Sequence, residues 1–232
     1  SHMGTVDVTG MDALDFVQRV ITNDATRLID GKALYSPVCN PSGGIVDDVL
    51  VYRLEEKHYR FVINAGNRDK DFQWFQSQAK DLRVELLPMS DGISLVAVQG
   101  PNSLPLVQDI LGVSLGHLGY YNFFFADWKG TALMVSRTGY TGELGFELFV
   151  ETELVGDLWD LLLERGKRYS VKPIGLGARD TLRLEMGYCL YGHEIDDTTS
   201  PLDAGLAWTV ALSKPSFVGQ DVLVSQQKKG LT

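Results

Sequence analysis

Hydrophobic positions recur along the chain with two different spacings. Short stretches rich in β-branched and aromatic residues alternate with polar residues, which is typical of strands that bury one face. Longer stretches place an apolar residue about every three or four positions, which is typical of amphipathic helices. These patterns predict strands at 5–9, 33–39, 45–53, 59–64, 83–87, 94–98, 121–126, 131–136 and 145–150. They predict helices at 12–22, 68–80, 102–111, 153–165 and 176–188. This mixture of elements predicts an α+β fold.

The two halves of the chain resemble one another. Residues 6–14 reappear in modified form at 96–104, and both stretches fit a strand, a glycine turn, a polar cap and a helix. A hairpin that carries glycine and acidic residues follows each copy, at 43–48 and 142–147, and a helix with a central tryptophan comes next. This order is the split pattern of ferredoxin-like folds, so we expect two pseudo-symmetric antiparallel lobes with a ligand-binding cleft between them. The competing interpretation is coincidence, because strand–helix units with glycine turns are common.

Composition and charge exclude several classes of protein. Of the 232 residues, 44% are hydrophobic and 22% are charged, which excludes a disordered, collagen-like or coiled-coil chain. The formal net charge of −9 argues against a surface that binds nucleic acid or anionic membranes. No apolar run approaches the roughly 20 residues of a membrane span, and no signal peptide opens the chain. Only Cys39 and Cys189 are present, so a reducing cytoplasm is the simpler location.

Both ends of the chain look cut. The opening Ser1-His2-Met3 fits either the scar of an expression tag or native sequence. Residues 226–232 form a polar stretch in which we expect no closing helix or strand.

Several common catalytic motifs are absent from the sequence. There is no phosphate-binding P-loop and no nucleophile elbow of the Gly-x-Ser-x-Gly type. Residues 175–180 resemble half of a dinucleotide fingerprint, but Asp180 stands where the third glycine would be, and its charge would repel a pyrophosphate. The four histidines do not pair with the two cysteines at metal-ligand spacing, so no metal site is predicted.

Two adjacent acids begin the predicted strand at 45–53. Because side chains alternate along a strand, Asp48 shares one face with Val46 and Leu50, and Asp47 lies on the other. An acid among apolar neighbours is costly unless it has a partner, which makes these residues candidates for a functional site. The competing interpretation is that one of them merely caps the hairpin turn.

Two further polar stretches are candidates for ligand contact. The glycine-rich loop at 136–147 lets the backbone approach a ligand closely and ends in Glu147, which could instead be a solvent-facing acid on an edge strand. On the helix predicted at 176–188, Arg179 and Arg183 share a face because they are four residues apart. Asp180 and Arg183 could simply pair with one another.

Taken together, these stretches resemble the glycine cleavage T-protein family, whose members are aminomethyltransferases that use tetrahydrofolate. The motifs that carry the resemblance are Gly43-Gly44-x-x-Asp47-Asp48, Val98-Gln99-Gly100-Pro101, residues 136–143 and 175–185, and Leu190-Tyr191-Gly192. They follow the family's order along essentially the whole chain. The resemblance implies two ferredoxin-like, Greek-key α+β lobes at 1–91 and 92–212. It also implies that 213–232 is a linker towards a C-terminal β-barrel domain that this chain lacks.

The resemblance also assigns roles to single residues. Asp48 would be catalytic, beside the reactive nitrogens of the folate, and Glu147 would pair with the pterin ring, whose ring N–H and exocyclic amine suit a forked carboxylate. Arg179 would contact the ligand. The remaining positions implied to line the folate cleft are Tyr35, Asn64, Tyr120, Tyr188, Trp208 and, if it is native, Met3.

The implied reaction belongs to one-carbon metabolism and glycine catabolism. A methylene unit passes from the aminomethyl-lipoyl group of H-protein to tetrahydrofolate, giving 5,10-methylenetetrahydrofolate and ammonia. The expected partners are lipoylated H-protein and folate, without nucleic acid or membrane, in a bacterial-type cytoplasm. The alternatives are another tetrahydrofolate-dependent enzyme, either a demethylase or one of the sarcosine and dimethylglycine type, and a folate-binding iron–sulfur assembly factor. The assembly factor is disfavoured because Ser216 replaces its signature cysteine.

Overall fold

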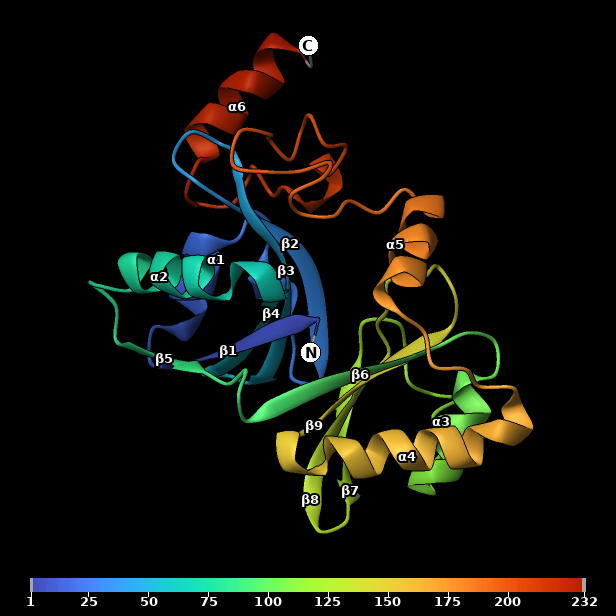
Figure 1. The fold of residues 1–232 in the computed structure, drawn as a ribbon. Coiled ribbons are helices and arrows are strands. Elements are labelled where there is room, and N and C mark those ends of the chain that lie inside the picture. Colours follow the sequence, from blue (N-terminus) through green and yellow to red (C-terminus); the bar gives the residue numbers. More distant parts are fainter. Residues whose placement is uncertain (1, 231–232) are drawn as a thin grey trace. The chain divides into compact units, whose positions relative to one another are not determined.

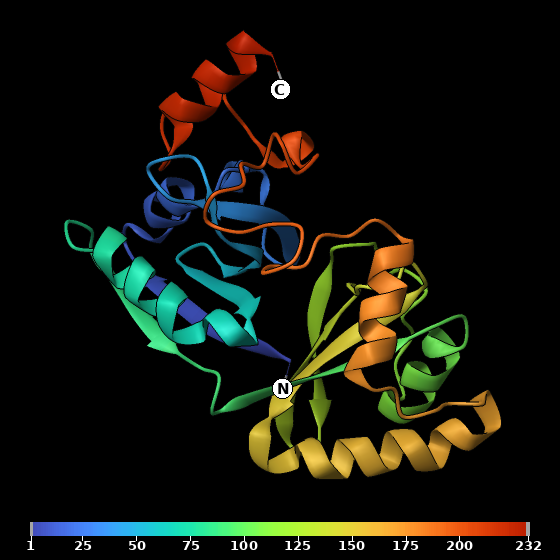
Figure 2. The same cartoon turned by 45° about the horizontal axis from the view of Figure 1, so that its top comes forward.

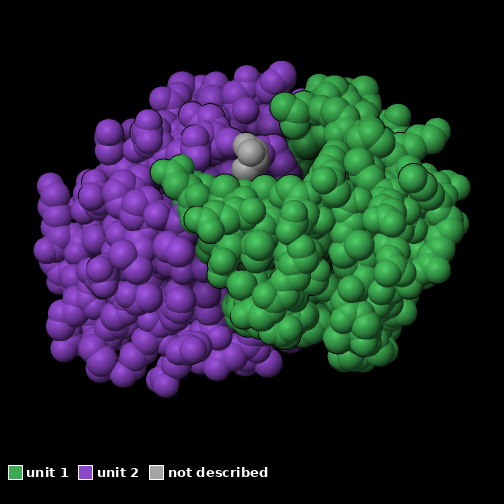
Figure 3. Space-filling model, turned by 60° about the horizontal axis from the view of Figure 1, so that its bottom comes forward, with its two compact units in different colours: residues 1, 90–188 green, residues 2–89, 189–232 purple. Residues whose placement is uncertain are grey.

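The chain is built on two antiparallel sheets, and each sheet is covered on one face by helices (Figure 1). The computed structural model describes residues 2–230, so the expectations that concern Ser1 and residues 231–232 lie outside the described residues. Contacts divide these residues into two compact units, coloured separately in Figure 3. We call residues 2–89 with 189–230 the first unit and residues 90–188 the second unit.

The first unit holds a five-stranded sheet with the order β2-β3-β4-β1-β5. Its strands are β1 (Met3–Gly10), β2 (Lys32–Cys39), β3 (Ile45–Glu55), β4 (His58–Asn64) and β5 (Val84–Pro88). The helices α1 (Ala13–Val20) and α2 (Arg68–Gln78) pack against this sheet on one side. The core between them contains Phe16, Phe61 and Phe75, whose ring centroids lie 4.9–6.3 Å apart. Burial of each such ring stabilises the unit by about 1.5–3 kcal/mol.

The second unit holds a four-stranded sheet with the order β6-β9-β8-β7. Its strands are β6 (Ile93–Gln99), β7 (Phe123–Trp128), β8 (Thr131–Ser136) and β9 (Gly145–Glu151). Its helices are α3 (Ser103–Leu111), α4 (Val155–Gly166) and α5 (Leu176–Glu185). Figure 2 shows α3 and α4 along this sheet, and Phe146, Leu148 and Leu158 belong to the core that they cover.

The two sheets confirm the internal repeat. The order β7-β8-β9-β6 repeats the order β2-β3-β4-β1, and β5 has no counterpart in the sheet of the second unit. The connections match as well, because β1 leads to α1 as β6 leads to α3. After β4 and after β9 comes a single 3-10 turn and then a helix, α2 or α4. Interpreting the likeness as coincidence was therefore wrong.

The two hairpins that carry glycine and acid are not equivalent, although the sequence pairs them. Residues 43–48 lead into β3, whereas residues 142–147 lead into β9. By sheet order the counterpart of β3 is β8, and the counterpart of β9 is β4. Asp48 and Glu147 therefore stand on different strands of the repeated unit.

The predicted strands and helices all form, with boundaries that shift by a few residues. The helix expected at 176–188 ends at Glu185, and the strand expected at 121–126 begins at Phe123. Single-turn 3-10 helices occur at Ala25–Arg27, Ala65–Asn67, Thr152–Leu154, Lys167–Tyr169 and Ala207–Thr209. In the described part of the chain, no helix has the length and apolar character that crossing a membrane requires.

The segment after residue 188 differs from the sequence-based expectation. Residues 189–212 were expected in the second lobe, but their contacts group them with the first unit. Ile195 and Leu206 pack on Ile45 at the start of β3, and this buried contact draws the segment onto the first sheet. The polar stretch near the end of the described residues also differs from expectation. The helix α6 (Gln220–Lys229) forms there, where the sequence predicts no closing element.

Lys214 fastens this returning segment to the first unit. Its buried ammonium donates hydrogen bonds to the carbonyls of Ile21 and Asn23 at 2.6 and 2.8 Å. Burial lowers the pKa of Lys214 to about 7, and the charge of Asp24 opposes that shift. The residue therefore serves as an internal tie to the end of α1.

Candidate functional site

The turn between β2 and β3 is closed by Asn40 and by neither of the two acids that follow it. The Asn40 side-chain oxygen accepts the backbone N–H groups of Ser42 at 2.9 Å and Gly44 at 3.1 Å. The interpretation that Asp47 or Asp48 caps this hairpin was therefore wrong. Both acids are left available for other contacts.

Asp47 faces the helices of the first unit. Val49 and Val51, which alternate in phase with it, belong to the core under α1 and α2. The carboxylate is buried, and it accepts the backbone N–H of Asn64 at 3.0 Å and the side-chain amides of Asn64 and Asn67 at 2.8 and 2.7 Å. Three donors satisfy this buried charge, so Asp47 holds β3, β4 and the start of α2 together.

Asp48 lies on the opposite face of the sheet and is half-buried. Its carboxylate accepts the hydroxyl of Tyr35 at 3.0 Å and the side-chain amide of Asn64 at 2.9 Å. Burial, followed by the charge of neighbouring Asp47, raises the pKa of Asp48 to about 7, although the two hydrogen bonds act in the opposite direction. The carboxyl can therefore take up or release a proton near neutrality.

A pair of stacked aromatic side chains adjoins Asp48. The Tyr35 ring stacks on Trp208 with centroids 5.9 Å apart, and 70% of Trp208 is exposed. Met3 pairs with Asn64 across β1 and β4. The structure thus gathers three of the predicted site residues, Tyr35, Asn64 and Trp208, around the Asp48 carboxyl, and places Met3 on the strand next to Asn64.

A third acid near Asp47 escaped the sequence analysis. Asp71 on α2 is only 1% exposed, and its oxygens have no hydrogen-bond donor among residues 2–230. Burial, a hydrogen bond shared with Asp47 and the charge of Asp47 raise the pKa of Asp71 to about 10. Asp71 is therefore a neutral acid at pH 7, and its proton can be donated to Asp47.

Glu147 lies on the interior strand β9 of the second unit. Phe146 and Leu148 point into the core under α3 and α4, so Glu147 occupies the other face, where it is 6% exposed. It therefore is not a solvent-facing acid on an edge strand. The hydroxyl of Thr138 donates to its carboxylate. Burial raises the pKa of Glu147, whereas this hydrogen bond and the charge of Arg179 lower it.

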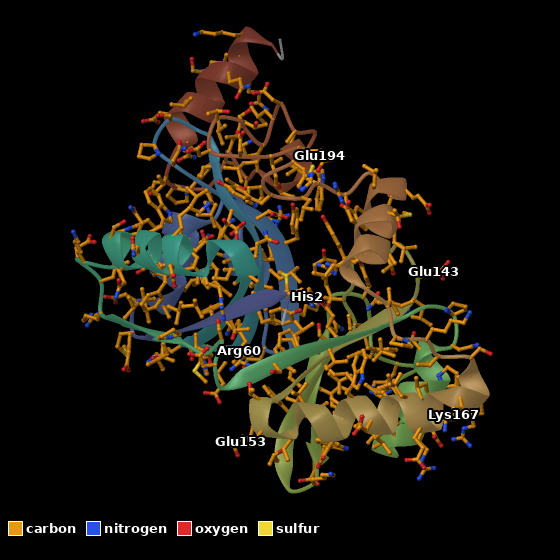
Figure 4. All side chains as sticks on the ribbon, in the orientation of Figure 1. His2, Arg60, Glu143, Glu153, Lys167 and Glu194 are labelled. Atoms are coloured by element: carbon orange, nitrogen blue, oxygen red, sulfur yellow. The ribbon has the colours of Figure 1, made fainter. Side chains whose placement is uncertain are left out.

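A cavity of about 380 Å³ is lined in part by Thr138, the residue whose hydroxyl donates to Glu147. It is lined by Tyr120, Tyr188 and the loop 137–145, which includes Glu143, labelled in Figure 4. The Tyr120 side chain as a whole is largely exposed. Partial burial of its hydroxyl, followed by the charges of Tyr188 and Glu147, nevertheless raises the pKa of Tyr120. Glycines, two tyrosines and polar backbone surround a space suited to a flat, polar ring.

The two arginines of α5 have different partners. Arg183 is buried, pairs with Asp180 at 2.7 Å and donates to the carbonyl of Tyr188 at 3.0 Å, which confirms the predicted Asp180–Arg183 pair. The guanidinium of Arg179 lies 4.5 Å from the centroid of the Tyr140 ring, and that ring stacks on Tyr188. Arg183 therefore fixes the end of α5, and Arg179 supplies positive charge near Glu147.

The described residues offer acid–base and hydrogen-bonding chemistry. They contain no group of three histidine, cysteine, aspartate or glutamate side chains placed to hold a metal ion. The first unit presents a carboxyl that titrates near neutrality among aromatic side chains. The second presents a buried glutamate, an arginine and a cavity. Taken separately, the groups of the first unit can exchange a proton and stabilise a developing positive charge, and those of the second unit can bind a planar heterocycle.

Comparison with known proteins gives consistent matches. Residues 1–214 match the family model described as the GCVT N-terminal domain. Proteins named aminomethyltransferase are 46% identical in Halothermothrix orenii over 232 residues and 47% identical in Alkaliphilus oremlandii over 233. Each alignment covers 100% of this chain but only 65% and 63% of the relative, so the chain spans less than two thirds of their length.

Solved structures show the same likeness. The glycine cleavage system aminomethyltransferase T from Bartonella henselae superposes with a TM-score of 0.90 at 33% identity, over 99% of this chain and 62% of that one. A heterotetrameric sarcosine oxidase from Corynebacterium sp. U-96 matches with a TM-score of 0.53 at 11% identity, over 75% of this chain and 85% of that one. The second match shows a shared fold alone.

Proposed function

The chain belongs to the GCVT N-terminal domain family, and on that premise we propose that it is the tetrahydrofolate-binding part of an aminomethyltransferase. In this reaction a methylene unit passes from the aminomethyl-lipoyl arm of H-protein to tetrahydrofolate. The products are 5,10-methylenetetrahydrofolate, ammonia and the lipoyl thiol. The observation that supports the proposal most is Asp48, a carboxyl with a pKa of about 7 that Tyr35 and Asn64 hold in one orientation.

Asp48 would act on the nitrogens that receive the one-carbon unit. Tetrahydrofolate supplies these nitrogens, and both lose a proton during the transfer while the thiol and ammonia each gain one. A carboxyl that titrates near neutrality can accept such a proton and return it. Its negative charge also stabilises the cationic character that develops at nitrogen and at the one-carbon unit. The hydrogen bonds from Tyr35 and Asn64 fix the carboxyl before the substrate arrives.

Glu147 would recognise the pterin ring. A carboxylate accepts a ring N–H and an adjacent exocyclic amine as a fork, and each oxygen keeps a lone pair when Thr138 donates to one of them. Arg179 would contact the ligand, and its positive charge favours the ionised form of Glu147 against the effect of burial. Aromatic and apolar side chains of each unit would also contact the folate: Tyr35, Trp208 and Met3 in the first unit, and Tyr120 and Tyr188 in the second.

The proposal is tested by titrating tetrahydrofolate into the protein and then supplying aminomethyl-lipoyl H-protein. We expect calorimetric binding, followed by release of ammonia and formation of 5,10-methylenetetrahydrofolate. Absence of tetrahydrofolate binding would refute the folate role. Binding without transfer from aminomethyl-lipoyl H-protein would instead favour the other one-carbon enzymes, because the fold alone does not separate them.

A further inference from the structure

The side chain of Gln99, at the end of β6, passes between two glycines of the cavity loop. A Cβ atom at Gly139 would lie 2.0 Å from the Gln99 side-chain oxygen, and one at Gly145 would lie 2.2 Å from it. Atoms of real side chains do not approach so closely, so both positions require glycine as long as Gln99 keeps its place. The position of the Gln99 side-chain amide therefore explains why glycine stands at both 139 and 145.

The amide of Gln99 uses both its ends. Its nitrogen donates to the carbonyls of Thr138 at 3.2 Å and Phe146 at 3.1 Å. Its oxygen accepts the hydroxyl of Thr141 at 3.1 Å. These partners lie near the start of the loop 137–145, in its middle and directly after it, so one side chain holds the loop at three points.

These contacts lead directly to the carboxylate of Glu147. The Thr138 carbonyl is bound by Gln99, and the hydroxyl of the same residue donates to Glu147. Phe146, the second carbonyl partner, precedes Glu147 on β9. We propose that Gln99 is a positioning residue for pterin recognition, which acts by fixing Thr138 and thereby the orientation of the Glu147 carboxylate. This inference rests on the proposed folate-binding function.

The base of the loop does not depend on the Gln99 side chain. The backbone N–H of Gly100 donates to the carbonyl of Leu144 at 2.7 Å, and the hydroxyl of Ser103 donates to the same carbonyl at 3.1 Å. The backbone of residue 99 also pairs with Gly145 in the sheet. Replacement of the amide should therefore leave the strands paired and release mainly Thr138.

The experiment combines Gln99→Met, Glu147→Gln and the double variant in calorimetric titrations with tetrahydrofolate. Methionine has nearly the length of glutamine but removes the amide, so we expect binding to weaken about fivefold to tenfold, the size of one or two neutral hydrogen bonds. The double variant should bind no more weakly than Glu147→Gln alone, because Gln99 acts through Glu147. Gln108→Met is the matched control, since that half-buried amide accepts the Leu115 N–H at 2.8 Å and does not line the cavity.

A second pair of variants keeps the test decisive if Gln99→Met does not fold. Thr138→Val removes the hydroxyl and should weaken binding in the same way, without further loss when combined with Glu147→Gln, whereas Thr138→Ser should restore it. Wild-type affinity in Gln99→Met or in Thr138→Val, or fully additive losses in the double variants, would overturn the inference. Unchanged affinity in Glu147→Gln alone would instead refute the pterin role of Glu147, which belongs to the proposed function.

Discussion

The surroundings of Asp48 in the first unit and of Glu147 in the second show how a repeated fold can give two carboxylates different chemistry. Both lie on the face of their sheet that is turned away from the paired helices, and burial raises the pKa of both. The neighbours differ. Asp48 adjoins a second carboxylate, Asp47, whereas Glu147 adjoins a hydroxyl and the charge of Arg179. Similar burial combined with different neighbours therefore gives an acid with a pKa of about 7 in one unit and a hydrogen-bonded acceptor in the other.

The largest effect should follow from the removal of the exchanging acid. Asp48→Asn keeps the shape and the hydrogen bond from Tyr35 but can neither ionise nor carry a proton. We expect turnover with aminomethyl-lipoyl H-protein to fall about 10²-fold or more, the scale of one preorganised electrostatic group. The rate of 5,10-methylenetetrahydrofolate formation measures this. A variant with comparable turnover to the wild type would contradict the assignment.

Replacement of Glu147 should change the affinity for tetrahydrofolate. Glu147→Gln presents an amide donor to the donors of the pterin, so we expect tetrahydrofolate binding to weaken by about 1.5–3 kcal/mol, the scale of a charge-assisted hydrogen bond. Calorimetry at fixed ionic strength measures the loss. Glu164→Gln on α4, which is exposed and lies outside the cavity lining, is the control and should bind within about twofold of the wild type, because a single surface charge contributes little. Equal losses in both variants would mean that general charge decides the affinity.

The pair Asp47 and Asp48 can be separated by pH. The charge of Asp47 contributes to the raised pKa of Asp48, so Asp47→Asn should shift the midpoint of the rate–pH profile to lower pH. The same variant should lower the free energy of unfolding by about 1–3 kcal/mol, because a buried acceptor of three donors is weakened. Rates measured from pH 5 to 9 and urea unfolding give the two values. A midpoint that stays in place, or moves upward, would show that Asp47 does not act on Asp48.

The smallest effect on turnover should come from Asp71→Asn, since a neutral amide replaces an acid that is already neutral. Its stability should nevertheless respond to pH. The wild-type Asp71 pKa of about 10 lies above the ordinary 3.8, so its contribution to stability is complete at low pH and declines as pH rises through that interval. Asparagine does not ionise, so its contribution to stability does not fall as the pH rises. The stability of Asp71→Asn relative to wild type should therefore increase from pH 5 to pH 8 in urea unfolding, and parallel values would show that Asp71 is ionised.

Much of this arrangement could be predicted from residue spacing. Alternation along β3 placed Asp47 and Asp48 on opposite faces, because that rule depends only on the backbone. The repeat predicted two similar lobes but paired the wrong hairpins, since glycine and acidic residues suit many turns. Asp71 could not be predicted, because Arg68, Asp69 and Lys70 beside it suggest an exposed helix face.

The helix α6 was not predicted from the sequence for a related reason. In α6 only Leu223 is buried, so the sequence carries almost no apolar periodicity. Its burial depends on Cys39, which lies far away in the chain and packs against it. Contacts of this kind leave no local pattern. The roles of the predicted site residues remain predictions, although the structure gathers Tyr35, Asn64 and Trp208 around Asp48.

The return of residues 189–230 to the first sheet has a consequence for the order of folding. The second unit is one continuous stretch, so all its strand pairings can form as soon as residue 188 has been synthesised. The first unit must wait for a segment that begins a hundred residues after β5, and the closure of so long a loop carries an entropic cost and slows folding. Because Trp208 on that segment stacks on Tyr35, the surroundings of Asp48 are completed only after the second unit has been synthesised.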